Sequence, residues 1–324
     1  MLKTQFAVLL ASTFLTALPV AAAHNSLPEL RPQQQQQLSS YLKEHWMSPE
    51  KYLVSKFIDH DIVFAGEYHR IKHDVKLIRD VIPLLYSAGV HNLGIEFGAN
   101  EYQQQVDQLT TAENYDEVLA RKIIFDSYYS WGYQDYEDIY RAAWLLNRSL
   151  PTGAPKFRIV NLKYKVRFDL ARDETGMTPK AQTMTKDDWA KVFCRGDEDE
   201  FMAWVIEREF LAKNQKALVY SGMHHAFTRY KQPIYDFQKK KLYKLNSKRM
   251  GNLIYAKIGN RAFNVLLHCP WGPKTTDETN ENAIYPVNGV IDAVMRSFSN
   301  KRVGFDVKGT PFGQLRDDLD YASI

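Results

Sequence analysis

The sequence predicts an α/β fold, with a mainly parallel central sheet flanked by helices and with helical insertions. The first observation is a short apolar run at residues 62–66, IVFAG, followed by a helical pattern at 73–87 and a second apolar run at 92–98. Short links between strand, helix and strand are typical of parallel α/β sheets. The second observation is that similar apolar runs return at 157–163 and 216–222. Together they favour one sheet built from strands that are distant in the sequence.

The N-terminal elements carry clear start and stop signals. A helix is expected from Pro49, because Ser48 is a good N-cap and Glu50 suits the first helical turn. The helix at 73–87 places its apolar residues on one side and ends at Gly89, since glycine readily adopts the conformation of a helix C-terminus. The residues on that side are Val75, Ile78, Val81, Ile82 and Leu85.

The remaining elements follow from the same patterns. Residues 101–150 are mostly helical in pattern, and one long helix is predicted over 186–213. Residues 251–260 and 262–272 are interpreted as a further helix and strand. The lysine-rich run 239–249, KKKLYKLNSKR, is interpreted as the solvated basic face of a helix.

Residues 1–23 are typical of a secretory signal peptide. Lys3 gives the positive start, residues 6–20 are mostly apolar, and residues 21–23 are the small residues of a cleavage pattern. The mature chain is therefore expected to begin near His24 and to be periplasmic or secreted, with no stable membrane span. The alternative is an uncleaved anchor, although the apolar part is short for a span.

Beyond the signal peptide, we expect a polar leader at residues 24–47 and a single α/β domain at 48–324. The leader contains a low-complexity QQQQQ tract. The formal charge of +4 is small for 324 residues, so composition predicts neither a nucleic-acid nor an anionic-membrane partner.

The chain contains two cysteines, Cys194 and Cys269. In an oxidising compartment they could form a disulfide, while the favoured interpretation is two independent buried thiols. Two cysteines far apart in the sequence do not have the spacing of a zinc knuckle. His268 and Cys269 end the last apolar run, which would bring them near the end of its strand.

Ionisable residues follow three of the predicted strands. Glu67 and His69 come after the first, Glu96 ends the second, and His224 and His225 follow the strand at 216–222. Ligands of doubly wound sheets bind at the carboxyl ends of the strands, where these side chains would meet if the strands are neighbours. Glu96 requires a partner, because an isolated carboxylate at the end of an apolar run costs several kcal/mol. We expect one histidine of the adjacent pair in the site.

The two histidine segments share one spacing, Gly66-x-x-His69 and Gly222-x-x-His225. Each glycine is expected to let the chain turn sharply off its strand, so that the histidine lies about one turn later. His73, one helical turn beyond His69, is interpreted as a structural residue or as a residue that supports the site.

Signatures of other common enzyme classes are absent from the sequence. It contains no G-x-S-x-G, no G-x-x-x-x-G-K-[ST], no G-x-G-x-x-G and no H-E-x-x-H. An ordinary serine hydrolase, a nucleotide-dependent enzyme and a zincin are therefore disfavoured.

Several stretches resemble the superfamily of erythromycin esterase-like and ChaN-like proteins, and the order in which they occur also matches. VFAGEYHR at 63–70 is similar to the first motif, and LGIEFG at 93–98 to the second strand ending in Glu. WGYQDYEDIYRAAWLLN at 131–147 resembles the esterases' Trp-containing helix, and residues 199–227 resemble their helix and strand ending near His. The paired G-x-x-H spacing is also similar to the Tiki/TraB metalloproteases.

The resemblance implies that Glu67, His69, Glu96 and His225 form the site. In the esterases His and Glu activate water, in Tiki-like proteins histidines hold a divalent metal, and ChaN-like proteins bind haem. One departure is that the esterases have Gly-x-Asp after the third strand, whereas this chain has Asn-Leu-Lys at 161–163. The loss of that carboxylate weakens a direct transfer of the esterase mechanism.

The leading hypothesis is a hydrolase that cleaves an ester or peptide bond in a small-molecule or peptide substrate. His69 or His225 would act as the general base, and Glu67 or Glu96 would orient the water or protonate the leaving group. A divalent metal held by His69, Glu96 and His225 is equally compatible, because a His-His-Glu set leaves coordination positions open for water.

The second hypothesis is a haem- or metal-binding protein without catalysis. Tyr129, Tyr133, Tyr136 and Tyr140 are spaced to share one helix face, which would form an aromatic wall or supply a haem ligand. The alternative interpretation of that face is ordinary packing into the core. A third hypothesis is a structural relative that has lost its chemistry.

Overall fold

In a computed structural model of the chain, the described residues are 27–128, 131–172, 183–236, 239, 241–270 and 285–316. The expected signal peptide, and most of the polar segment after residue 274, lie outside them. The signal peptide therefore stays a prediction, as does the division into a polar leader and one α/β domain.

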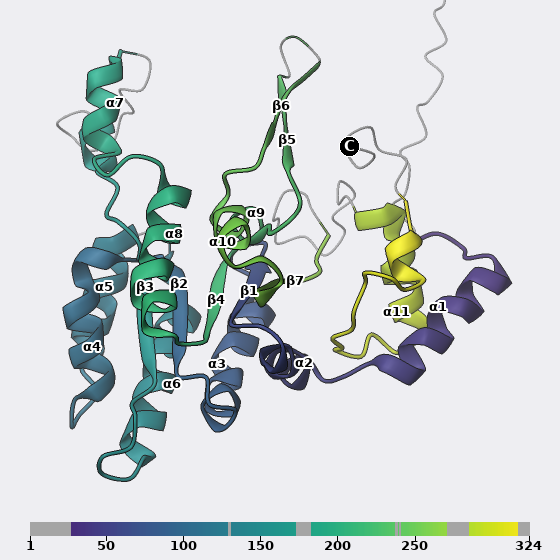
Figure 1. Cartoon of the computed structure of the whole chain (residues 1–324), viewed down its shortest axis with the longest axis horizontal. Coiled ribbons are helices and arrows are strands. Elements are labelled where there is room, and N and C mark those ends of the chain that lie inside the picture. Colours follow the sequence, from purple (N-terminus) through teal and green to yellow (C-terminus); the bar gives the residue numbers. More distant parts are fainter. Residues whose placement is uncertain are drawn as a thin grey trace, which may run out of the picture.

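A five-stranded sheet forms the centre of the molecule (Figure 1), and all its strands are parallel. The spatial order is β3-β2-β4-β1-β7, so β4 lies between β2 and β1 although it follows them by more than a hundred residues. The predicted α/β class is confirmed. The strands are β1 (Ile62–Glu67), β2 (Asn92–Ala99), β3 (Arg158–Lys163), β4 (Ala217–Gly222) and β7 (Ala262–Leu266).

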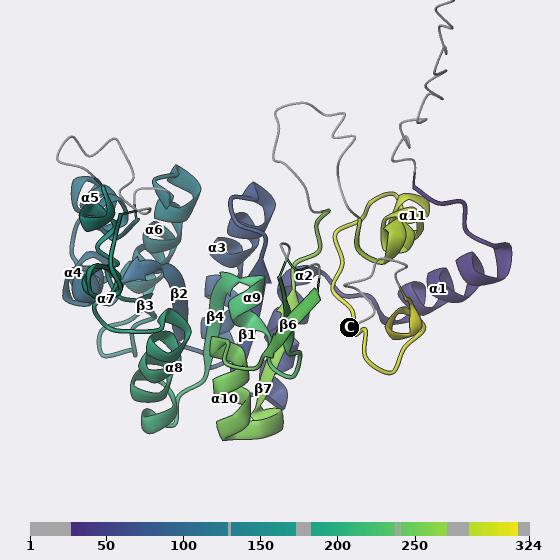
Figure 2. The same ribbon diagram turned by 90° about the horizontal axis from the view of Figure 1, so that it is seen from above.

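Helices cover both faces of the sheet (Figure 2). A second, two-stranded antiparallel sheet consists of β5 (Gln232–Asp236) and β6 (Lys241–Asn246). The helices are α1 (Pro32–His45), α2 (Pro49–Ser55), α3 (Lys72–Ser87), α4 (Gln103–Thr111), α5 (Glu117–Tyr128), α6 (Gln134–Ser149), α7 (Lys186–Val192), α8 (Glu198–Glu209), α9 (Met223–Ala226), α10 (Met250–Ile258) and α11 (Val290–Ser297).

Alternate residues of each strand feed two separate apolar cores, because successive strand side chains point to opposite faces. Val63 of β1 packs with α3 and α6 on one face. Phe64 of the same strand packs with α8 and α10 on the other. Both faces are buried, which explains why the strands are nearly continuous apolar runs rather than alternating patterns.

A third apolar cluster joins the two ends of the described chain. Leu38 and Leu42 of α1 are buried against Val294 of α11 and against Phe312. The QQQQQ tract of the polar leader thus belongs to a packed helix. The cluster is tied to the rest of the molecule through Asp306, whose carboxylate accepts from the Tyr52 hydroxyl at 2.8 Å and the Lys56 ammonium at 2.7 Å.

Two element predictions are wrong. The helix predicted over 186–213 is broken into α7 and α8, because Gly196 adopts a φ of 80° and Asp197 then caps α8 by accepting from the backbone N–H of Glu200 at 3.1 Å. The basic run 239–249 is not a helix face. Residues Lys241–Asn246 of this run form strand β6, which pairs with β5.

In the described residues, no helix combines the length and the apolar character needed to cross a bilayer. The two cysteines are not joined by a disulfide; Cys269 is buried as expected, whereas the expectation of a buried Cys194 is wrong, because its side chain is exposed.

Candidate functional site

The strand order brings the ends of β2, β4 and β1 side by side. In the register of β1 and β4, Glu67 lies opposite Gly222, the last residue before the adjacent histidines. Glu96 follows the last residue of β2 that pairs with β4, and its carboxylate reaches back to accept the Gly222 backbone N–H at 2.6 Å. The predicted convergence at the carboxyl edge of the sheet is therefore present in the structure.

The two G-x-x-H segments fit into one another. A Cβ on Gly66 would lie 2.8 Å from the Cα of Met223, and a Cβ on Gly222 would lie 2.6 Å from Cε1 and 2.8 Å from Nε2 of His69. The expected reason for these glycines was a sharp turn, but Gly222 has an ordinary φ of −54°. Their role is instead to allow close approach, which brings each segment against the other.

The turn after β1 is held in an uncommon backbone conformation. His69 and Arg70 have φ values of 20° and 61°, in or at the border of the left-handed region. The Arg70 backbone N–H donates to the Tyr136 hydroxyl at 2.8 Å, and the Trp131 ring packs edge-on against His69 with centroids 4.6 Å apart. Such strain persists only where neighbouring groups enforce it, as Tyr136 and Trp131 do here.

Glu67 is the centre of a buried hydrogen-bond cluster. Its side chain is 2% exposed, and its carboxylate accepts from the Tyr136 hydroxyl at 3.0 Å and from the Tyr220 hydroxyl. Burial and the Glu67 charge raise the pKa of both tyrosines, so the hydroxyls keep their protons and donate. The His69 Nδ1–H donates to Glu67 at 2.9 Å, which leaves Nε2 directed toward Gly222.

His225 lies between two carboxylates. Its Nδ1–H donates to Asp199 at 2.6 Å, and its Nε2 lies 3.4 Å from Glu96. Burial lowers the pKa of His225, but the charges of Glu96 and Asp199 outweigh burial and raise it above its ordinary value. Asp199 also accepts from the Arg249 guanidinium at 3.0 Å and from the Met250 backbone N–H at 2.8 Å. The imidazolium form of His225 is thus favoured.

Glu96 remains charged despite its burial. Burial alone would raise its pKa, but His225, Lys163 and His69, with the Gly222 N–H, lower it to about 2. The Lys163 ammonium lies 3.7 Å from Glu96 and 2.5 Å from Glu198. The lysine that departs from the esterase pattern therefore lies inside the site, beside the predicted glutamate.

The structure shows which histidine of the adjacent pair His224 and His225 lies in the candidate site. His225 contacts Asp199 and Glu96, whereas His224 is exposed and its ring packs near Phe227, with centroids 5.8 Å apart. His73 is exposed at the start of α3. The His268 Nε2 pairs with the Asp292 carboxylate of α11 at 3.1 Å. This pair is separate from the hydrogen bonds that join the other predicted site residues.

Sequence reasoning missed Asp199 and Tyr220. Asp199 lies in the acidic start of α8, which suggests only a favourable interaction with the helix dipole, and Tyr220 lies inside an apolar strand. The sequence gives no local signal for either contact, because Asp199 lies 26 positions from His225 and Tyr220 lies 153 positions from Glu67. The one hint in the sequence is that Tyr220 places a polar hydroxyl in a buried strand, directly before Ser221 and Gly222, where a hydrogen-bond partner is needed.

The predicted tyrosine face is divided between the site and the core. Tyr136 contacts Glu67, and Tyr140 is fully buried with its hydroxyl donating to Asn161 at 3.3 Å. Tyr133 is 49% exposed, and Tyr129 lies outside the described residues. The hydroxyls of Tyr136 and Tyr140 are engaged by protein groups, so neither is poised as a haem ligand.

The predicted metal set of His69, Glu96 and His225 does not fit a divalent cation as these side chains are arranged. Within the described parts of the chain, no three His, Cys, Asp or Glu side chains are placed to hold a metal ion. Lys163 already supplies a positive charge near Glu96. We therefore derive no step through a metal.

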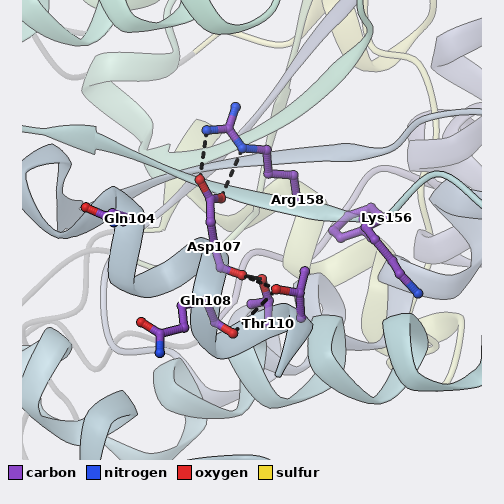
Figure 3. A pocket seen from close by; sticks show the side chains of 8 residues that line it. Gln104, Asp107, Gln108, Thr110, Lys156 and Arg158 are labelled. Atoms are coloured by element: carbon purple, nitrogen blue, oxygen red, sulfur yellow. Dashed lines mark hydrogen bonds and ion pairs between the residues drawn. The ribbon is translucent and has the colours of Figure 1, made fainter. Parts of the chain in front are cut away.

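A pocket at the opposite, amino edge of the sheet has no free acid–base group (Figure 3). Arg158 at the start of β3 donates to Asp107 through Nε at 3.0 Å and Nη2 at 3.1 Å, and its Nη1 donates to Glu209 at 2.6 Å. Lys156 donates to the Asn147 carbonyl at 2.8 Å. The pocket is lined by Gln104, Asp107, Gln108, Thr110, Thr111, Lys156, Phe157 and Arg158.

No family model matches the chain, and no curated protein matches it. A solved protein from Bacillus cereus is similar over 90% of this chain and 85% of its own, with 11% identity and a TM-score of 0.45. ChaN of Campylobacter jejuni, described with cofacial haem binding, is similar over 74% of this chain and 91% of its own, with 15% identity and a TM-score of 0.37.

The C-terminal region of Pasteurella multocida toxin, described with a thiol-protease-like triad, is similar over 74% of this chain and 28% of that one, with 8% identity and a TM-score of 0.41. At these identities and TM-scores, the similarities carry no argument about activity or ligand. The resemblance to erythromycin esterase-like and ChaN-like proteins stays a prediction.

Proposed function

We propose that the protein is a hydrolase of the erythromycin esterase-like/ChaN-like type that cleaves an ester or peptide bond by general acid–base catalysis. One observation supports this most strongly: His69 and His225 each donate Nδ1–H to a carboxylate, while His69 Nε2 lies at Gly222 and His225 Nε2 lies 3.4 Å from Glu96, whose carboxylate binds the Gly222 N–H. Two histidines that are held in fixed orientations near Gly222 are suited to act as a pair, one accepting a proton and the other donating one.

The two histidines have different roles in this proposal. His69 is 38% exposed, and its Nε2 would take the proton of an attacking water while Glu67 fixes the ring. His225 is 18% exposed, and because its imidazolium is favoured by Asp199 and Glu96 it would protonate the leaving group. The water oxygen bonds to the acyl carbon, the bond to the leaving oxygen or nitrogen breaks, and that atom takes the His225 proton.

In this proposal the substrate is a small molecule or a peptide. The expected signal peptide would bring the protein to such a substrate in the periplasm or outside the cell. The exposed side of His69 lies at the carboxyl edge of the sheet, where ligands of such folds bind. Trp131, which is partly buried and packs edge-on against His69, gives that edge an apolar side chain.

The test is hydrolysis of p-nitrophenyl esters and of a fluorogenic peptide mixture by purified wild type, His69→Ala and His225→Ala. We expect each substitution to lower the rate about 10²- to 10⁴-fold, the typical contribution of a positioned acid or base. His73→Ala, which removes an exposed histidine nearby, is the matched control and should keep the wild-type rate. Equal rates in all four proteins would contradict the proposal.

The haem- or metal-binding alternative is measured on the same preparations. Elemental analysis and an absorbance spectrum show whether metal or haem accompanies the protein. A stoichiometric metal or a Soret band that disappears in His225→Ala, together with no hydrolysis, would favour binding without catalysis.

A further inference from the structure

We propose that the β5–β6 ribbon docks on an anionic phospholipid surface. This goes beyond the proposed hydrolysis and does not depend on it. Figure 1 shows the ribbon projecting beyond the carboxyl edge of the sheet, on the side where α9 lies. A surface that meets the ribbon would therefore be on the same side of the molecule as the candidate site.

Strand β6 exposes three large apolar side chains. Tyr243 is 67% exposed, Leu245 46% and Leu242 42%. The register with β5 shifts at this point: Ile234 pairs with Lys244 and Tyr235 with Leu242, so Tyr243 lies at a β-bulge. A lone two-stranded ribbon is marginally stable in water, so three exposed large apolar residues in six positions indicate a surface that is covered in use.

The same strand is basic. Lys241 and Lys244 are both exposed, and the segment Lys241–Asn246 contains no acidic residue. The net charge of the whole chain is only +4, which is why composition predicted no anionic partner. On the ribbon and beside it, the exposed Lys231, Lys239, Lys241 and Lys244 outnumber the acidic Asp236, which lies opposite Lys241.

The combination of lysine with leucine and tyrosine favours a lipid surface over a nucleic acid. Lysine side chains can lay their apolar stems on a surface while the ammonium groups reach phosphates. Tyrosine suits the boundary between headgroups and acyl chains, and leucine gains free energy by entering the apolar layer. A phosphodiester backbone would leave the two leucines without a partner.

The base of the ribbon is joined to the candidate site. The Arg249 guanidinium donates to Gln232 of β5 at 2.7 and 2.9 Å and to Asp199 at 3.0 Å. Asp199 in turn holds His225. A docked ribbon would thus keep a fixed orientation relative to the histidines, without needing a membrane-spanning segment.

The test is co-sedimentation of the purified full chain with vesicles of phosphatidylcholine, with and without phosphatidylglycerol. We expect binding only to vesicles that contain phosphatidylglycerol, and weaker binding as salt increases. Lys241→Gln/Lys244→Gln should weaken binding about thirtyfold, from the usual contribution of two lysines near such a surface. Leu242→Ser/Leu245→Ser should weaken it at least about tenfold.

The matched control is Lys43→Gln/Lys308→Gln, which removes two exposed lysines that lie outside the ribbon, one in α1 and one in the C-terminal segment, and should bind as wild type does. Circular dichroism checks that all variants are folded, as expected for exposed positions. No vesicle binding, or equal loss in the control, would overturn the proposal. Tighter binding to a single-stranded oligonucleotide, or dimerisation lost with the ribbon substitutions, would also overturn it in favour of another partner.

Discussion

Asp199 is one of the two carboxylates, with Glu96, that determine the protonation state of His225. Its carboxylate accepts the Nδ1–H at 2.6 Å and raises the pKa of the imidazole together with Glu96. Asp199→Asn removes that charge, so the pKa of His225 should fall. If His225 is the acid, the alkaline limb of the rate profile should lie above pH 6.5 in wild type and shift to lower pH in the variant.

The measurement is the rate of ester hydrolysis against pH for wild type and Asp199→Asn. We also expect the maximal rate to fall by about 10²-fold or more, since the ring loses its orientation. Asp59→Asn, at an exposed position, is the control and should leave both the rate and the limb unchanged. An unmoved alkaline limb would show that His225 is not the acid.

Gly222 tests the close approach of the two histidine segments. Gly222→Ala would place a Cβ 2.6 Å from the His69 ring, so the ring must move and its bond to Glu67 must weaken. We expect hydrolysis to fall at least about tenfold, with the His69 NMR signal shifted and His225 little changed. Ser221→Ala, in the same buried strand, should keep the wild-type rate. A fully active Gly222→Ala protein would contradict the arrangement.

At the scale of elements, α8 links stability to the site. Asp197 caps this helix, and Glu198 and Asp199 follow in its first turn. Asp197→Ala should lower the free energy of unfolding by about 0.5–2 kcal/mol and also lower activity, because the first turn carries the partner of His225. Denaturant unfolding and the hydrolysis rate of the same protein measure the two effects.

Ser48→Ala is the matched control for that cap. Ser48 caps α2 by accepting from the Lys51 N–H at 3.4 Å, on an element that supplies no residue to the site. We expect a comparable loss of stability with unchanged activity well below the unfolding transition. Equal losses of activity in both cap variants would mean that α8 has no particular role.

Element prediction succeeded where local patterns decide the outcome. The strand at 62–66 and the helix at 73–87 were correct within one residue, since apolar periodicity and the glycine after the helix specify them. The run 239–249 was wrong because its lysines hide a strand pattern that only pairing with β5 reveals. The helix at 186–213 was wrong because a single glycine with positive φ and a following cap broke it.

The site residues also divide into those that local sequence patterns predict and those that only the tertiary fold determines. Glu67, His69, Glu96 and His225 could be predicted, because each ends or follows an apolar strand and parallel strands share one carboxyl edge. The roles of Asp199, Tyr136 and Tyr220 depend on the order β2-β4-β1 and on which helix covers which strand. No spacing in a single sequence contains that information.

At the scale of the whole molecule, the buried charges predict how stability depends on pH. Glu96 has a folded pKa of about 2 against an ordinary 4.5, so its stabilisation is present above pH 4.5 and is lost as pH falls toward 2. His225 has a raised pKa, so its stabilisation is present below pH 6.5 and is lost as pH rises through the folded value.

Stability from these two groups should therefore be greatest between about pH 4.5 and 6.5. Thermal unfolding across pH measures the profile. Glu96→Gln should flatten its acid limb, because the substituted side chain does not titrate, while Glu44→Gln on the exposed surface of α1 should leave it unchanged. An acid limb that is the same in Glu96→Gln and wild type would refute the assignment.

The central claim is that His225 is an imidazolium held by two carboxylates beside His69. NMR titration of histidine-labelled protein tests it without a substrate, with the His225 signal assigned by its absence in His225→Ala. We predict a His225 pKa above 6.5 in wild type and a lower one in Asp199→Asn. A wild-type pKa at or below 6.5 that Asp199→Asn does not change would contradict the account.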